Sequence, residues 1–159
     1  RPPKKEKFFG ATNLLTGVAL GAAAWYDVKT TLDARALVGD NPRPVPPGTL
    51  MADGSPAPPG AFRGDRLFPG PDGQVRYVVL HEKSSFYRSS VFDGNRGAMW
   101  RRKAYVNVPV WVGSHFLRRS RHWPLKVAGY ALPLAIGGIQ LKAGIDNRQE
   151  IDRIEEWLY

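Results

Sequence analysis

The distribution of apolar and charged residues sets two long stretches of the chain apart. Residues 123–142 hold fifteen uncharged residues between Lys126 and Lys142, and residues 8–28 carry Asp27 as their single charge. A hydrocarbon core about 30 Å thick needs about 20 apolar residues, and flanking lysines extend a shorter segment because their aliphatic stems reach the interface. The pattern therefore predicts two transmembrane helices, over 8–28 and 123–142.

Small residues and a proline determine how we expect these two helices to pack. Gly17 and Gly21 lie four residues apart, so on a helix they share one face that a neighbouring helix can approach closely. Pro133 removes the helical hydrogen bond to the carbonyl of Gly129, which predicts a kink. Both helices are expected to pack against other protein. The predicted helix-packing residues are Gly17, Gly21, Gly129, Pro133 and Gly137.

A region rich in proline and glycine lies between the two apolar segments. Residues 39–73 contain nine Pro and seven Gly, a density at which regular helices and strands are not expected. We interpret this region as an extended strap on a partner's surface, or as disorder. The β-branched residues at 74–80 follow a turn signal and predict a short hairpin with Leu67 and Phe68.

Basic clusters flank a third uncharged run, residues 104–117. Its fourteen residues are too few to span a membrane, and Pro109 is expected to interrupt any helix. We interpret the run as an interfacial or re-entrant segment whose flanking cations bind phosphates. The alternative is a buried strand in a small β region. The predicted lipid-headgroup residues are Arg101, Arg102, Lys103, Arg118, Arg119 and Arg121.

The C-terminal residues 145–159 show helical periodicity, with apolar positions on one face and acidic residues on the other. A helix of this length is marginal alone, so we expect it to dock on a partner subunit. The predicted docking residues are Ile151, Ile154, Trp157 and Leu158.

These patterns together predict a mostly α-helical membrane protein with irregular regions and no compact soluble domain. The predicted segments are a basic tail (1–7), a transmembrane helix (8–28), a helix extension (29–38), the Pro/Gly-rich extended strap (39–73), a small hairpin with loops (74–100), a basic interfacial segment (101–122), a second transmembrane helix (123–142) and an amphipathic C-terminal helix (145–159).

The composition and net charge of the chain limit the partners and reactions that we expect. The net charge of +9 and the pI of about 10.1 suit anionic partners such as acidic lipid, acidic protein or nucleic acid. The chain has no cysteine, and His81, His115 and His122 are scattered without metal-ligand spacing. No nucleophile and base pattern has local support. We therefore expect no enzymatic activity, no cofactor and no metal site.

The function that fits these features is that of a non-catalytic accessory subunit of a multi-subunit mitochondrial inner-membrane complex. A respiratory-chain complex or the ATP synthase is the expected host, and the chain would staple subunits together and bind anionic phospholipid such as cardiolipin. The first residue is Arg1, as expected after removal of an organellar presequence. One alternative is a basic RNA-binding organellar ribosomal protein. Another is an accessory subunit of a photosynthetic complex in the plastid thylakoid membrane.

Overall fold

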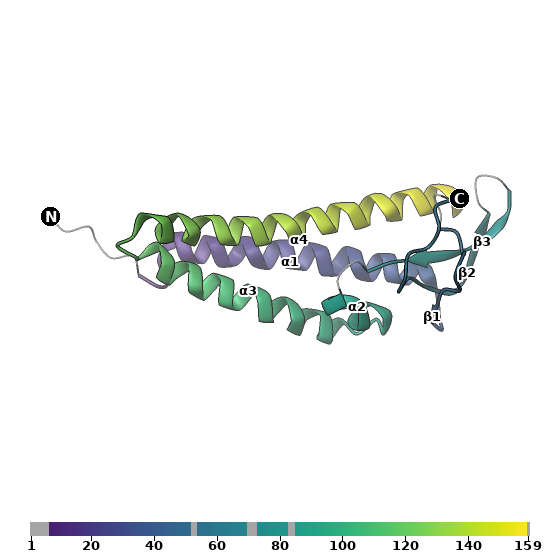
Figure 1. The fold of residues 1–159 in the computed structure, drawn as a ribbon, viewed down its shortest axis with the longest axis horizontal. Coiled ribbons are helices and arrows are strands. Elements are labelled where there is room, and N and C mark those ends of the chain that lie inside the picture. Colours follow the sequence, from purple (N-terminus) through teal and green to yellow (C-terminus); the bar gives the residue numbers. More distant parts are fainter. Residues whose placement is uncertain (1–6, 52–53, 70–72, 83–84, 159) are drawn as a thin grey trace.

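Three long helices form most of the molecule. The computed structural model describes residues 7–51, 54–69, 73–82 and 85–158. Helices α1 (Ala11–Val38), α3 (Arg96–Arg118) and α4 (Trp123–Leu158) run along the long axis (Figure 1). Helices α1 and α4 stay together along their length, whereas α3 meets them near the α3–α4 turn and diverges toward the other end. The bundle is therefore closed at one end and wedge-shaped at the other.

The wedge end carries a small sheet and a short helix. Strands β1 (Arg43–Pro44), β2 (Phe62–Pro69) and β3 (Val75–Leu80) form an antiparallel sheet in the order β1-β2-β3. Leu67 pairs with Tyr77, and Phe68 pairs with Arg76. This pairing confirms the hairpin predicted from the turn signal and the β-branched residues at 74–80. Helix α2 (Ser85–Phe92) leads into α3, which begins after an Asn95 cap whose Oδ1 accepts the amide hydrogen of Ala98.

The apolar core lies where the sheet meets the helices. Phe62 and Phe68 of β2 are buried with Val78 of β3 and with Ile154 near the end of α4. Alternation along the strands turns these side chains to one face, and the helical repeat brings Ile154 onto them. The sheet and the helices therefore share one packed core, and the prediction of no compact domain is wrong.

The prediction of two transmembrane helices is also wrong. Among the residues that the structure describes, no helix combines the length and the apolar content that crossing a membrane requires. Residues 11–28 and 123–142 belong to α1 and α4, which continue well past these segments into charged sequence, and residues 8–10 precede α1. Glycine and alanine make up much of both segments, and such small residues contribute little apolar area.

Two further predictions change with the tertiary structure. Residues 104–117 lie inside α3 with Pro109 in the helix interior, so they form a helix and not the strand given as the alternative, while the interfacial position stays a prediction. A proline costs one backbone hydrogen bond, and packing on α1 and α4 holds the helix together around it. The helix predicted over 145–159 is present as the continuation of α4, and the predicted strap contains β1 and β2.

Candidate functional site

The closed end of the bundle has an apolar exterior. We call residues 8–26 and 104–141 the tip half, and the other described residues the sheet half. On α4, Leu134 is 76% exposed and Ile139 is 66% exposed, and Val18 of α1 is 69% exposed. Aliphatic and aromatic side chains face outward on all three helices. Representative exposed residues are Leu15, Val18, Tyr105, Val108, Phe116, Leu132, Leu134 and Ile139.

The interior of the tip half is polar. Asn13 of α1 and Ser114 and His115 of α3 are buried almost completely, and Gln140 of α4 is buried as well. Within the described part of the tip half, Leu20 is the single large aliphatic side chain that is buried. This arrangement reverses the usual one, in which polar side chains face water and apolar ones fill the core.

Arg118 joins the three helices of the tip half. Its guanidinium donates to the Asn13 side-chain oxygen at 2.7 Å, to the Ser114 hydroxyl at 3.2 Å and to the Gly129 carbonyl at 3.2 Å. The Gly129 carbonyl accepts this bond because Pro133 has no amide hydrogen to donate to it. The proline therefore leaves an acceptor that binds α3 to α4.

Further hydrogen bonds hold the tip half together. The side chains of Asn107 and Gln140 exchange two bonds, of 2.7 and 3.3 Å, between α3 and α4. The Trp111 indole donates to the Asn13 carbonyl at 2.7 Å, between α3 and α1. A buried polar group costs free energy unless it is hydrogen-bonded, so these bonds account for most of the polar interior. The Nδ1 atom of His115 has no hydrogen-bond partner among the described residues.

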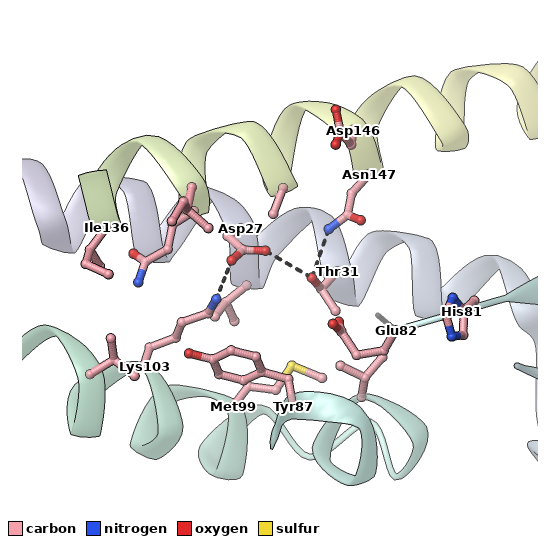
Figure 2. Close-up of a pocket in the computed structure, with 16 residues that line it drawn as sticks. Asp27, Thr31, His81, Glu82, Tyr87, Met99, Lys103, Ile136, Asp146 and Asn147 are labelled. Carbon is pink, nitrogen blue, oxygen red and sulfur yellow. Dashed lines mark hydrogen bonds and ion pairs between the residues drawn. The ribbon is translucent and has the colours of Figure 1, made fainter. Parts of the chain in front are cut away.

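A cavity of about 360 Å³ lies in the wedge where α3 diverges from α1 and α4. Figure 2 shows side chains from α1 and α4 entering it from one side, and side chains from α2 and α3 entering from the other. We call it the wedge cavity. Its volume falls in the range of natural small-molecule sites, which is about 300–1,000 Å³.

A buried ion pair crosses the wedge cavity. Lys103 of α3 pairs with Asp27 of α1, and each side chain is 9% exposed. Asn147 of α4 donates to the Thr31 hydroxyl at 3.0 Å, and this hydroxyl lies 3.5 Å from the Asp27 carboxylate. The ion pair and its neighbours hold the diverging helices at a fixed separation.

Tyr87 of α2 projects into the same cavity. Its ring centroid lies 4.2 Å from the Lys103 ammonium nitrogen, and Figure 2 shows its hydroxyl in the space between the two pairs of helices. Burial raises the pKa of the Tyr87 hydroxyl above 10.0, and the carboxylates of Asp27 and Glu82 raise it further against the opposing effect of Arg102. The hydroxyl therefore stays protonated at neutral pH and available as a donor.

The polar side chains of the wedge cavity supply hydrogen-bonding groups beside an apolar wall. The described residues contain no group of three or more His, Asp or Glu side chains that would hold a metal ion. Lys103 is paired with Asp27, so its charge is balanced within the cavity. The cavity offers hydrogen-bond donors beside an apolar wall that includes Val106, Ile136 and Ile139.

The predicted lipid-headgroup residues do not form one surface, because some are buried and the others lie at opposite ends of α3. Lys103 and Arg118 are buried in the bonds described above, and Arg102 donates to the Phe86 carbonyl and, at 2.7 Å, to the Ser89 hydroxyl. Arg119 and Arg121 are exposed at the tip, at the far end of α3 from the exposed Arg101. Headgroup binding by these residues stays a prediction, for which Arg119 and Arg121 have the more suitable position.

The predicted helix-packing residues differ in how closely they are packed. A side chain on Gly129 would lie 2.7 Å from the Arg118 amide nitrogen, and one on Gly17 would lie 3.0 Å from the Trp111 indole. Nothing lies within 4 Å of the corresponding position on Gly21, and Gly137 has Leu20 at 3.8 Å. Pro133 is buried inside α4.

The predicted docking residues lie on the last turns of α4. Ile151 and Ile154 are buried within this chain, so both side chains already have neighbours. The side chains of Trp157 and Leu158 lie outside the described part of the chain.

Sequence reasoning missed the wedge cavity because its residues come from four separate helices and from the segment between β3 and α2. Asp27 and Lys103 are 76 positions apart, and Tyr87 and Asn147 lie in other segments again. One signal was present: Asp27 is the single charge within 8–28, and Lys103 is adjacent to the uncharged run 104–117. Opposite charges at such positions indicate a buried pair across two helices.

The fold and the cavity define a three-helix bundle with a small sheet at its wedge end. Comparison of the chain with family models, with curated proteins and with solved structures finds no match. No family or relative therefore supports the mitochondrial and complex-subunit roles expected from the composition, and the transmembrane expectation is overturned by the helices themselves.

Proposed function

We propose that this chain is a non-catalytic structural subunit of a larger assembly, in which partner helices cover its tip half. The observation that carries the proposal is the reversed distribution of side chains in the tip half, polar inside and apolar outside. Exposed apolar residues that occur singly are normal, but contiguous apolar surface on three neighbouring helices is typical of an interaction surface.

The interhelical hydrogen bonds inside the tip half are those expected of helices that lie in an apolar environment. Helices whose outer surfaces face apolar groups gain little from hydrophobic contact with one another. They associate through small residues and interhelical hydrogen bonds, as Gly129 and Arg118 do here. An apolar partner surface supplies that surrounding and removes the exposed aliphatic area from water, at about 25 cal/mol per Å².

The charges at the tip favour an anionic neighbour there. Residues 8–26 and 104–145 contain no Asp or Glu, whereas Arg119, Arg121 and Lys126 are exposed at the tip. The aromatic side chains of Trp123 and Phe116 are exposed beside them. Basic residues near an anionic lipid surface contribute about 1 kcal/mol each, and aromatic side chains suit its interface. The proposed assembly therefore holds an anionic phospholipid at the tip.

RNA binding is the alternative function that the basic composition suggests, and the structure favours it less than the structural role. An RNA interface places cations along the phosphate backbone, with aromatic rings available for stacking. The exterior of the tip half is instead aliphatic over most of α1 and α4. The mitochondrial host membrane stays a prediction from composition.

A native gel tests the structural role. The chain is expressed with a tag in its own host and extracted in mild detergent, and we expect it to migrate far above its mass of 17.7 kDa. Leu134→Glu places a charge on the apolar exterior of α4 and should release the chain from the assembly. Gln149→Glu, at an exposed position in the sheet half of α4, is the matched control. Migration of the unaltered chain as a monomer would refute the proposal.

Vesicle binding tests the lipid part separately. The purified chain is mixed with phosphatidylcholine vesicles with and without cardiolipin, and binding should need cardiolipin and weaken with salt. Removing two surface cations with Arg119→Gln and Arg121→Gln should weaken binding about 30-fold, at about 1 kcal/mol per cation. The double variant Arg148→Gln and Arg153→Gln, in the sheet half, is the control. Equal loss in both double variants would show that net charge, and not the tip, governs binding.

A further inference from the structure

We propose that the wedge cavity binds a neutral amphipathic molecule whose head carries a carbonyl or hydroxyl oxygen. The cavity is polar where Asp27, Lys103 and Tyr87 meet, and apolar where Val106, Ile136 and Ile139 line it. A ligand with one polar end and an apolar body matches this division. This inference does not depend on what covers the tip half.

The polar groups of the cavity supply donors. The Tyr87 hydroxyl makes no hydrogen bond with any described residue, and Figure 2 shows it in the open space between the helices. The Lys103 ammonium has three N–H donors, and Asp27 accepts the single hydrogen bond that it donates within the described part of the chain. Two donors that enter the cavity from α2 and α3 therefore suit an oxygen that accepts hydrogen bonds.

The charge of the lining selects against an anionic head. Asp27 and Glu82 both face the cavity, and Lys103 is the single ammonium in its described lining. Asp146 is paired with Lys142 at 2.8 Å, and its carboxylate points away from the cavity in Figure 2. A carboxylate or phosphate entering the cavity would have to share the Lys103 ammonium with Asp27, which already pairs with it, in a medium of low dielectric constant.

The apolar end determines where the body of the ligand lies. Val106 of α3 and Ile136 and Ile139 of α4 line the apolar part of the cavity, and Ile139 is also part of the apolar exterior of the tip half. An alkyl chain that starts at the Tyr87 hydroxyl would run between these side chains and continue along that exterior. The ligand class is therefore an alcohol, ketone or related neutral carbonyl compound with an aliphatic or ring body.

Three probes with tails of similar length test the selection of the head group. Methyl hexyl ketone, octanoate and octylammonium are titrated into the purified full chain by calorimetry. We expect the ketone to bind, octanoate not to bind, and octylammonium to bind more weakly than the ketone. Tighter binding of octanoate or octylammonium, or no binding of the ketone, would overturn the proposal.

Two variants place the binding in the cavity. Tyr87→Phe removes the hydroxyl donor and should weaken ketone binding roughly three- to tenfold, the effect of one hydrogen bond. Tyr105→Phe, whose side chain is 73% exposed on α3, is the matched control and should leave the affinity unchanged. Ala143→Leu fills part of the cavity and should abolish ketone binding while the helical circular dichroism is retained. Ketone affinity that is the same in all three variants would place binding elsewhere and overturn the proposal.

Discussion

The two halves of this molecule follow opposite rules of burial, although α1, α3 and α4 run through both. In the sheet half, Phe62, Phe68 and Ile154 fill an apolar core and charged side chains face outward. In the tip half, Asn13 and Arg118 are inside and aliphatic residues are outside. The change occurs near the Asp27–Lys103 pair and the wedge cavity.

This difference shows that one bundle is stabilised in two ways, by apolar burial in the sheet half and by interhelical hydrogen bonds in the tip half. A large apolar side chain buried in the sheet half contributes about 1.5–3 kcal/mol through removal from water. An interhelical hydrogen bond in the tip half contributes about 0.5–1.5 kcal/mol net, but leaving its partner unsatisfied costs more. The sheet half should therefore tolerate polar surface changes, and the tip half should tolerate little change inside.

The largest expected effect lies at the boundary between the halves. Lys103→Met removes one partner of the buried pair and should destabilise the chain by about 3–5 kcal/mol, because Asp27 is left buried and charged. The double variant Asp27→Leu and Lys103→Met should recover most of this loss. Chemical denaturation measures both, and Lys29→Met at an exposed pair, with an expected change below about 1 kcal/mol, is the control. If the double variant were no more stable than Lys103→Met alone, the loss of unfolding free energy would not come from an uncompensated charge on Asp27.

The next effect contrasts two positions on α4. Ile154→Ala opens a void in the sheet-half core and should cost about 2–5 kcal/mol. Leu134→Ala, in the tip half, should change the unfolding free energy by less than about 0.5 kcal/mol, since that side chain is 76% exposed. Thermal or urea unfolding of the isolated chain measures both. Equal losses at the two positions would mean that the tip half is packed like the sheet half.

A third pair of substitutions separates close packing from helix propensity within the tip half. Gly129→Ala places a methyl group 2.7 Å from the Arg118 amide nitrogen and 2.9 Å from the Ser114 carbonyl, and should cost about 1–3 kcal/mol. Gly138→Ala meets nothing within 4 Å and should stabilise α4 by about 0.5–1 kcal/mol. Unfolding curves that shift in the same direction for both variants would contradict the close contact of α3 with α4.

The smallest effect is a dependence of stability on alkaline pH. Tyr87 has a raised pKa in the folded chain, first because of burial and then because of Asp27 and Glu82. The unfolded chain therefore loses this proton first, and the contribution of Tyr87 is complete below pH 10.0 and lost as the pH rises through the folded pKa. Tyr87→Phe should flatten this part of the stability curve, whereas Tyr105→Phe should not. Identical slopes for the two variants would place the titration elsewhere.

Local sequence patterns predicted the type of several helices and strands, but not the tertiary contacts that those elements make. The β-branched residues at 74–80, after a turn signal, predicted β3, and its pairing with residues 67–68 is observed. The periodicity at 145–159 predicted a helix, but not that α4 would run unbroken from Trp123. Pro109 was expected to end a helix, and it lies inside α3 because contacts with α1 and α4 outweigh the one lost hydrogen bond.

The sequence by itself determined where charge is absent, that residues 8–28, 123–142 and 145–159 favour helices, and that the charged residues of the tip are all basic. These properties depend on neighbours within a few positions, or on composition. It did not determine that Asn13, Arg118 and Gln140 face inward while Leu134 faces outward. The tertiary structure alone decided this, as it decided the pairing of Asp27 with Lys103, because each choice depends on contacts between residues far apart in the chain.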